Sequence, residues 1–211
     1  MKRPLSRRGL LNAVGALTHQ DEDLARITST YGPPPLWERE RGFHTLVHII
    51  LEQQVSLASA KAAYDRLLAA VDTLTPANFL RLSDTQLRRI GFSRQKTRYG
   101  RELAMAVTEN RLDLAGLERL DDRDARAQLM QVKGIGTWTA DIYLLMVLRR
   151  PDIWPRGDLA LEIAIQRVKA LSRRPTPDEA RQISESWRPW RAVAARLLWH
   201  FYLSERKAPA I

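Results

Sequence analysis

The sequence predicts an all-α protein, and three observations support that prediction. Apolar residues recur at helical spacing along most of the chain, most clearly between residues 43 and 51. Start signals for helices are frequent, and two are complete capping boxes, Ser83 with Gln86 and Thr176 with Glu179. No stretch between turn signals alternates apolar and polar residues as a half-buried strand does. We therefore expect helices joined by short connections.

In the N-terminal part of the chain we expect one or two short helices before residue 31. The run Gly32-Pro33-Pro34-Pro35 cannot continue a helix and predicts a stiff, extended connector. Farther along, Thr75-Pro76 and Ser83 mark helix starts, and Gly91 marks a helix end. The helices expected up to residue 109 are 43–53, 57–71, 76–82, 84–90 and 94–109.

The C-terminal part continues the helical spacing. A nearly all-apolar segment from Trp138 to Leu148 predicts a buried helix, and Thr176-Pro177 marks the start of another. The helices expected here are 122–131, 137–149, 159–171, 177–187 and 189–204. Because the connections are short, we expect residues 1–211 to form one bilobed domain without a separate N-terminal domain.

Composition narrows the class of protein. The 211 residues include no cysteine, which excludes a disulfide scaffold, a thiolate nucleophile, a zinc finger and an iron–sulfur cluster. A content of 45% apolar and 27% charged residues is ordinary for a folded protein, so wholesale disorder is excluded. No apolar run reaches the length of a membrane span, and no signal-peptide core follows the first residues. We expect a cytoplasmic protein.

The charge balance indicates a polyanionic partner. Basic residues outnumber acidic ones by 34 to 24, which gives a net charge of +10. Residues 88–101 contain six basic side chains and no acidic one, a pattern that suits contact with a phosphate backbone. A solvated helix face explains that cluster equally well. Arg94 and Lys96, at the start of the helix 94–109, are the side chains we expect to contact phosphates.

A glycine-containing hairpin carries the first specific signal. Two glycines around one aliphatic residue, in Gly134-Ile135-Gly136, permit a tight turn between the helices 122–131 and 137–149. The first main-chain amides of the second helix then face outward at the positive end of its dipole, which suits a phosphate group. Taken alone, a Gly-x-Gly sequence is more often a bare turn. The residues expected to contact a phosphate backbone are Lys133, Gly134, Gly136 and Thr137.

An aspartate follows the hairpin. Asp158 lies 22 residues after Gly136, behind a loop with proline and glycine and before a helical run. As an isolated feature, an aspartate at this place is better explained as the N-cap of the helix 159–171. Asp141 and Asp152 are rival carboxylates. We expect Asp141 to support helix packing and Asp152 to lie in a surface loop.

Taken together, these residues resemble a known family. The pattern Gly134-Ile135-Gly136-x-Trp138-Thr139-Ala140, followed by an aspartate at this distance, is similar to the helix-hairpin-helix/Gly-Pro-Asp DNA glycosylases, and most similar to the 3-methyladenine DNA glycosylase II branch. Three more segments match in order within residues 40–204: Phe43 to Ser56, Ile90 to Lys96 and Trp187 to Trp199. The resemblance implies a two-lobed helical fold, with the helix-hairpin-helix at about 122–149 and the active site in the cleft between the lobes.

The resemblance also implies a reaction. Asp158 matches the carboxylate that, after the damaged base has flipped out, stabilises the positively charged sugar or activates the attacking water. Family members that also cut the DNA strand carry, at the position of Trp138, a lysine that forms a Schiff base with the sugar. The resemblance therefore implies a monofunctional base-excision repair enzyme for alkylated purines of the 3-methyladenine type. It implies no AP lyase activity and no cofactor.

Contacts to the DNA and to the flipped base follow from the same resemblance. Gln53 and Gln54 match the wedge that fills the gap left by the base, and capping the end of the helix 43–53 is the alternative interpretation. The base pocket needs aromatic walls, because aromatic faces attract cationic alkylated purines. We expect Trp187 and Trp190 to pack in the core instead. The residues that match pocket positions are Trp138, Ile142, Trp199 and His200, although aromatic residues are common in the family where this chain has Ile142 and His200.

Metal binding is considered at two places. His44, His48 and Glu52 share one helix face, as metal ligands do, but a polar helix face is the preferred interpretation and no metal is expected there. The hairpin of the family often holds a monovalent cation on main-chain carbonyls. The matching residues are Met130, Val132 and Ile135, and such a cation would have a structural role.

Two other functions stay open at this stage. One is a glycosylase for deaminated or oxidised bases, and the other is a non-catalytic DNA-binding module that uses the same hairpin. An aspartate beside an aromatic pocket favours an enzyme, since a module that only binds DNA needs neither. The expected partner is double-stranded DNA containing damaged bases, and the protein is expected to be a monomer associated with the nucleoid.

Overall fold

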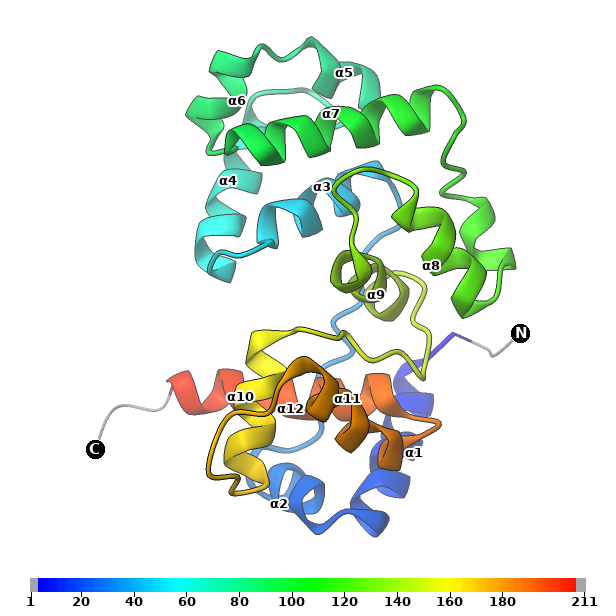
Figure 1. Ribbon diagram of the computed structural model, residues 1–211, viewed down its shortest axis with the longest axis vertical. Helices are drawn as coiled ribbons and strands as arrows, with labels where there is room; N and C mark the ends of the chain where they lie inside the picture. Colours follow the sequence, from blue (N-terminus) through cyan, green and yellow to red (C-terminus); the bar gives the residue numbers. More distant parts are fainter. Residues whose placement is uncertain (1–3, 208–211) are drawn as a thin grey trace. The chain divides into compact units, whose positions relative to one another are not determined.

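The computed structural model describes residues 4–207, and every regular element in that range is a helix (Figure 1). The all-α prediction is therefore confirmed. The α-helices are α1 (Arg7–Gln20), α2 (Glu22–Tyr31), α3 (Phe43–Glu52), α4 (Leu57–Ala69), α5 (Pro76–Arg81), α6 (Asp84–Ile90), α7 (Arg94–Thr108), α8 (Asp122–Met130), α9 (Thr137–Met146), α10 (Leu159–Val168), α11 (Pro177–Ser184) and α12 (Arg191–Lys207), and the 3₁₀ helices are η1 (Gly116–Arg119) and η2 (Glu185–Trp187).

The helix bounds differ from the prediction mainly in two places. The expected short N-terminal helices are two full helices of 14 and 10 residues, because Asp21 ends α1 and its side chain accepts the Asp23 and Leu24 amides at the start of α2. The 3₁₀ helix η1 was not predicted. Its first amide, from Gly116, donates to the side chain of Asp113 over 2.9 Å.

The chain forms two compact units. Unit 1 is the continuous stretch of residues 39–143, and unit 2 combines residues 4–38 with residues 144–207. The chain therefore crosses between the units twice, once after the proline-containing connector and once inside α9.

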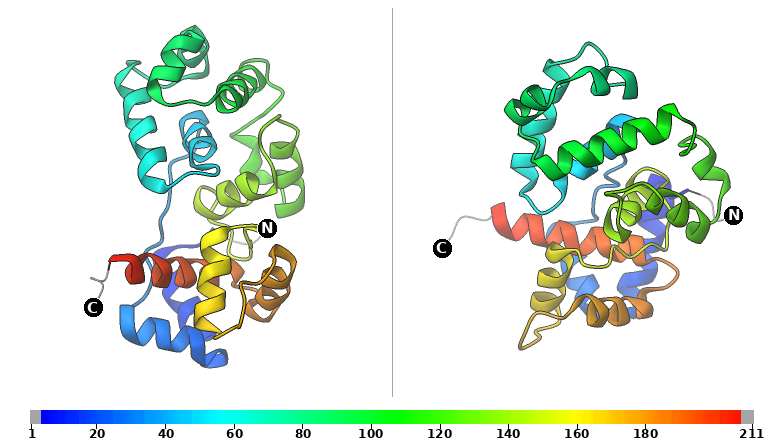
Figure 2. Two further views of the ribbon diagram at one scale, coloured as in Figure 1. Left: turned by 60° about the vertical axis from the view of Figure 1, so that its left-hand side comes forward. Right: turned by 45° about the horizontal axis from the view of Figure 1, so that its top comes forward.

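Unit 1 is built around α3, which buries seven of its ten residues. This helix packs against α4 and α7, and α7 also packs against α5 (Figures 1 and 2). The close approach of α5 and α7 depends on Gly100, because a Cβ atom there would lie 2.5 Å from the Phe79 ring. The ring of Phe79 in turn contacts Phe43, with centroids 5.8 Å apart. These contacts place the start of α3 and the middle of α7 against α5.

Unit 2 is built around α12, which packs against α10, α2 and α1 (Figure 2). Its most unusual residue is Arg196, which is fully buried. The guanidinium donates to the carbonyl oxygens of Leu36 (2.8 Å), Leu145 (2.8 Å) and Ala192 (3.0 Å), and burial lowers the pKa of Arg196 to about 10. Arg196 thereby joins α12 to the connector after α2 and to the end of α9.

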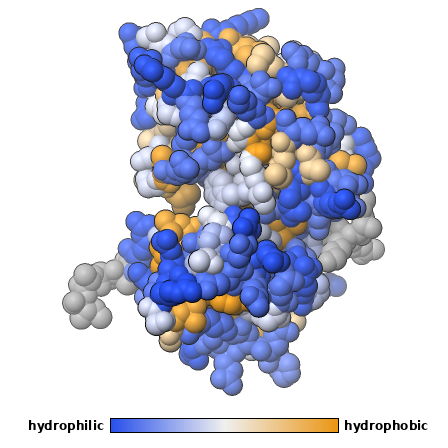
Figure 3. Space-filling model, viewed as in Figure 1, coloured by the Kyte–Doolittle hydropathy of each residue, from blue (hydrophilic) through white to orange (hydrophobic). Residues whose placement is uncertain are grey.

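Hydrophilic side chains predominate on the face shown in Figure 3, and apolar patches interrupt them. Within residues 4–207, no helix combines the length and the apolar character that a bilayer crossing requires. Three of the large apolar side chains that are exposed lie close in sequence to predicted site residues: Val55, Leu57 and Leu159. The first two follow Gln54, and Leu159 follows Asp158.

Candidate functional site

The hairpin lies in unit 1, between the end of α8 and the start of α9. Val132 and Ile135 are buried, and the Ile135 amide donates to the Val132 carbonyl over 3.0 Å to close the turn. The buried carboxylate of Asp141 accepts a hydrogen bond of 2.7 Å from Arg126 and so ties α9 to α8. The expectation that Asp141 supports helix packing is therefore confirmed.

The two glycines of the hairpin have different roles. Gly134 has φ +99°, and a Cβ atom there would lie 2.2 Å from the Tyr99 ring, so the fold itself requires glycine. A Cβ at Gly136 would meet no atom within 4 Å. Lys133, Gly136 and Thr137 are all exposed. The main chain at the start of α9 can therefore be approached closely by a ligand, and the first turn of a helix offers amide donors that the helix itself does not use.

The corner after α3 contacts the same hairpin. Gln53 is the C-cap residue of α3, and its side-chain amide donates to the Gly134 carbonyl and to Thr139 Oγ1, each over 2.9 Å. Gln54 has a left-handed backbone (φ +56°) and is exposed. Gln53 and Gln54 both match the wedge in sequence, but their surroundings differ. Gln53 ends the helix and connects it to the hairpin, whereas Gln54 is accessible to a ligand.

The basic segment is only partly available to a ligand. Lys96 is half-buried and donates to the Leu51 carbonyl over 2.7 Å, and burial lowers the pKa of its ammonium. Arg101 donates to the Leu82 carbonyl over 2.8 Å and to Asp84 over 2.6 Å. Arg94 is exposed in the first turn of α7. Two of the six bases therefore have partners inside unit 1, and Lys96, which we expected to contact phosphate, is one of them.

Asp158 lies in unit 2, at the N-cap of α10. A turn ending in Gly157 (φ +81°) leads into it, and its Oδ1 atom accepts the Leu161 amide over 3.0 Å. The indole N–H of Trp199 donates to the same oxygen over 3.2 Å. The capping interpretation is confirmed, while the catalytic role stays a prediction. Asp158 is 9% exposed, so the Leu161 amide and the Trp199 indole orient a largely desolvated charge.

A second buried carboxyl lies one turn farther along α10. Glu162 is 6% exposed, and burial together with the charge of Asp158 raises its pKa, against the opposing effect of Arg174. The Arg174 guanidinium lies 3.6 Å from Glu162. Glu162 is not among the site residues predicted from the sequence. Its signal was an acidic residue four positions after Asp158, which shares that helix face.

Comparison with known proteins agrees with these arrangements. A family model for HhH-GPD superfamily base excision DNA repair protein matches residues 47–189, which include the α3 corner, the hairpin and Asp158. The chain belongs to this superfamily.

Individual HhH-GPD relatives carry related names. The chain is 27% identical over 184 residues to a putative DNA-3-methyladenine glycosylase of Bacillus subtilis, a match that covers 83% of this chain and 64% of the relative. It is 27% identical over 180 residues to DNA-3-methyladenine glycosylase 1 of Schizosaccharomyces pombe, covering 83% and 79%. A solved structure of the Schizosaccharomyces pombe 3-methyladenine DNA glycosylase in complex with abasic DNA matches with a TM-score of 0.84 and 25% identity, over 95% of this chain and 99% of that one. The chain thus spans less than two thirds of the Bacillus relative.

The remaining residues matched to the HhH-GPD base pocket have unequal surroundings. Trp138 is half-buried in the first turn of α9, and Ile142 is buried in the same helix. His200 has a ring nitrogen 2.9 Å from the Tyr31 carbonyl oxygen, and its ring lies 6.3 Å from the ring centroids of both Tyr31 and Trp37. His200 therefore packs α12 against the end of α2, and its place in the base pocket stays a prediction.

One expectation about the loop before α10 is wrong. Asp152 is 5% exposed and does not lie on the surface. Its carboxylate accepts hydrogen bonds from Arg188 (3.0 Å) and Arg191 (2.9 Å), which attach this loop to the start of α12. Trp187 is fully buried, as expected for a core residue, and its indole N–H donates to Asp21 over 2.7 Å.

The histidine-containing face of α3 forms a polar cluster. Glu52 accepts two hydrogen bonds from Arg39, of 2.8 and 2.9 Å, and lies 3.7 Å from His48. The His48 ring stacks on Tyr64 with centroids 4.1 Å apart. Within residues 4–207 no three His, Cys, Asp or Glu side chains come together as metal ligands would. At the hairpin, the Val132 carbonyl already accepts the amide of Ile135.

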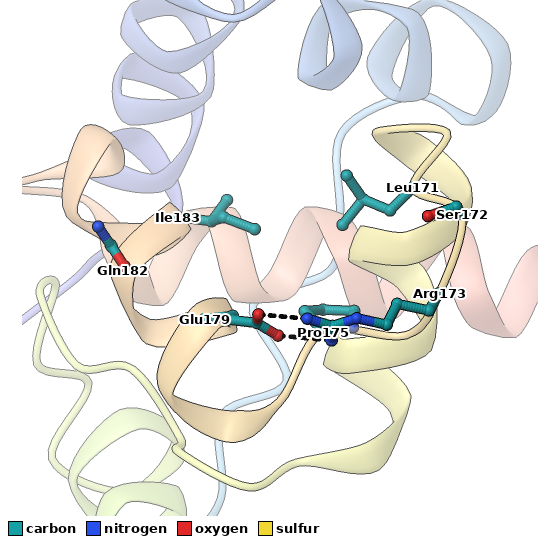
Figure 4. Close-up of a pocket in the computed structure, with 7 residues that line it drawn as sticks. All are labelled: Leu171, Ser172, Arg173, Pro175, Glu179, Gln182 and Ile183. Atoms are coloured by element: carbon teal, nitrogen blue, oxygen red, sulfur yellow. Dashed lines mark hydrogen bonds and ion pairs between the residues drawn. The ribbon is translucent and has the colours of Figure 1, made fainter.

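A surface pocket of about 350 Å³ in unit 2 lies elsewhere in the fold (Figure 4). Arg173 donates two hydrogen bonds, of 2.6 and 2.8 Å, to the Glu179 carboxylate across the pocket, and both side chains are exposed. The pocket contains none of the predicted site residues. Its lining consists of Leu171, Ser172, Arg173, Pro175, Glu179, Gln182 and Ile183.

Proposed function

We propose that this protein is a monofunctional DNA glycosylase that hydrolyses the N-glycosidic bond of alkylated purines in double-stranded DNA. One observation carries the proposal. Asp158, which matches the catalytic carboxylate of the superfamily, is largely buried and held by the Leu161 amide and the Trp199 indole. The names of the matched glycosylases support the same class of substrate.

The chemistry needs one carboxylate and no cofactor. A purine alkylated at a ring nitrogen carries a positive charge, so when the bond to C1′ breaks, the bonding electrons neutralise the base and it leaves without being protonated. The positive charge then resides on the sugar. A preorganised carboxylate stabilises that charge and accepts a proton from the water that adds to C1′. Asp158 performs this role, and the Leu161 amide and the Trp199 indole help to keep the carboxylate in one orientation.

The position of Trp138 argues against strand cutting. An AP lyase of this superfamily uses a lysine there, and an indole cannot form a Schiff base. Lys133 is exposed, and in the sequence it lies before Gly134, whereas Trp138 lies after it. Reduction with borohydride during the reaction should therefore trap no covalent protein–DNA adduct, and the abasic product should stay uncut until alkali is added. A trapped adduct that disappears in Lys133→Ala would contradict this assignment.

DNA is held by main-chain amides at the hairpin and by the exposed guanidinium of Arg94. Gln54 is the wedge, because Gln53 is already bonded within unit 1. The neighbouring exposed side chains, Val55 at 47% and Leu57 at 58%, give the corner the apolar character that suits insertion between bases. The protein acts as a monomer on nucleoid DNA in the cytoplasm.

The direct test is a substrate panel. Purified protein is incubated with duplexes that carry one methylated, deaminated or oxidised base, and abasic sites are revealed by alkali cleavage. Abasic sites in the methylated duplex support the proposal. Activity confined to a deaminated or oxidised base would assign another lesion class, and binding without any excision would identify a DNA-binding module.

A further inference from the structure

Lys96 belongs to the basic segment 88–101, yet its ammonium contacts another part of the protein. It lies in the first turn of α7, two residues after the exposed Arg94. Its ammonium donates to the Leu51 carbonyl over 2.7 Å, a contact between residues 45 positions apart in the sequence. Within unit 1, therefore, α7 reaches the last turn of α3.

The carbonyl that Lys96 contacts belongs to the end of a helix. The last four carbonyls of a helix have no intrahelical donor, and the helix dipole places negative charge there, so an ammonium is favourable in that place. Glu52 is the last residue of α3, and Gln53 and Gln54 follow at once. Fixing the Leu51 carbonyl therefore fixes the start of the corner that contains the wedge.

The corner needs such support because its backbone conformation is energetically unfavourable. Gln54 is a non-glycine residue with φ +56°, a conformation that an ordinary residue adopts at a cost of about 1 kcal/mol or more. Gln53 supports the corner from the hairpin, through the Gly134 carbonyl and Thr139. Lys96 supports it from α7, so the corner is attached on two sides within unit 1.

We propose that Lys96 is a positioning residue for base flipping: its ammonium caps the end of α3 and fixes the corner that carries Gln54, and it binds no DNA phosphate. The proposal rests on the proposed glycosylase function. Partial burial lowers the pKa of Lys96, which agrees with an ammonium partly withdrawn from solvent. The Leu51 carbonyl accepts one of its hydrogen bonds.

Salt dependence distinguishes this role from a phosphate contact. The variant Lys96→Met keeps most of the side-chain length and removes the charge, and Arg94→Met is the matched control in the same turn of α7. The affinity for DNA containing an abasic analogue is measured over a range of salt concentrations. Each lost phosphate contact reduces the log–log slope by about 0.9. We expect that reduction for Arg94→Met and an unchanged slope for Lys96→Met. A reduction of about 0.9 in Lys96→Met would overturn the proposal.

Excision from two duplexes tests the effect on flipping. One duplex carries the methylated base in a stable pair, and the other carries it opposite a base with which it pairs poorly. Extrusion costs less in the second duplex. Lys96→Met should lose about tenfold in single-turnover rate on the stable pair and less than threefold on the poor pair. Lys96→Arg, which keeps a cationic donor, should restore most of the loss. Equal losses on both duplexes would contradict a positioning role.

Hydrogen exchange on the free protein tests the contact without DNA. Amides of residues 52–57 should exchange faster in Lys96→Met than in the wild type, while those of α5 keep the wild-type rate. Unchanged exchange at residues 52–57 would overturn the proposal. Because this measurement needs no substrate, it tests whether Lys96 supports the corner even if the wild-type protein excises no base, an outcome that would instead refute the proposed function.

Discussion

The hairpin of unit 1 and the Asp158 region of unit 2 differ in the atoms that they present. The hairpin presents main-chain atoms, and the Asp158 region presents a side chain. At the hairpin, side chains from elsewhere in unit 1 cover Gly134, since Tyr99 packs on it and Gln53 bonds to its carbonyl, while the backbone at Gly136 stays uncovered. At Asp158 a main-chain amide and an indole orient the side chain that we propose as the catalytic group. In the proposed function, binding to any DNA sequence relies on main-chain atoms, whereas bond breaking depends on one carboxylate.

The largest effect should come from Asp158→Asn. Asparagine is as good an N-cap as aspartate, so the fold should survive, but the neutral amide cannot stabilise a positive sugar. We expect the single-turnover excision rate to fall about 100-fold to 1,000-fold, with unchanged affinity for abasic DNA. The rate is measured by alkali cleavage of a methylated duplex, and circular dichroism checks the fold. Full activity in this variant would remove Asp158 from the mechanism.

Alanine at each hairpin glycine should show which of the two glycines the fold requires. Gly134→Ala places a Cβ against the Tyr99 ring at a left-handed φ, and we expect it to lower the free energy of unfolding by about 3 kcal/mol. Gly136→Ala meets open space and should change it by less than about 0.5 kcal/mol. Urea unfolding followed by circular dichroism measures both. Equal losses in the two variants would contradict the distinction between the two glycines.

A larger side chain at the open glycine should affect DNA binding alone. Gly136→Arg adds a positive charge, which by itself favours DNA, yet it covers the backbone that a phosphate must approach. We expect affinity for abasic DNA to fall about tenfold on every sequence tested, which corresponds to about 1.4 kcal/mol. Fluorescence anisotropy with two unrelated sequences measures this. If a folded Gly136→Arg protein bound as tightly as the wild type, the hairpin would be only a turn.

An effect of similar size concerns the indole that orients Asp158. Trp199→Phe keeps an aromatic ring in a buried position and removes the N–H that donates to Oδ1. One lost hydrogen bond to a charged group corresponds to about 1.5 kcal/mol, so we expect roughly a tenfold slower excision rate. Trp187→Phe is a matched control, since its indole donates to Asp21 instead. A slower rate in the control with an unchanged Trp199→Phe would contradict the assigned role of Trp199.

Local signals in the sequence predicted the local features of the molecule. The capping box at Ser83, the end of a helix at Gly91 and the N-cap at Asp158 each depend on residues within four positions, and each is present. The expectation for Asp152 was wrong, and the interior contact of Lys96 was not predicted, because their partners, Arg191 and Leu51, lie 39 and 45 positions away. Nothing near a lysine in the sequence distinguishes an ammonium that meets solvent from one that meets a distant carbonyl.

The division of the chain has a consequence for how the protein is made. Unit 1 is a continuous stretch, so all its internal contacts become available once residue 143 has emerged from the ribosome. Unit 2 is different, because α1 and α2 are synthesised first and pack against α12, whose residues come last. At about 5–20 residues per second, α2 waits on the order of ten seconds for that partner. During synthesis, the contacts of unit 1, which contains the hairpin, are therefore complete before those of unit 2, which contains Asp158.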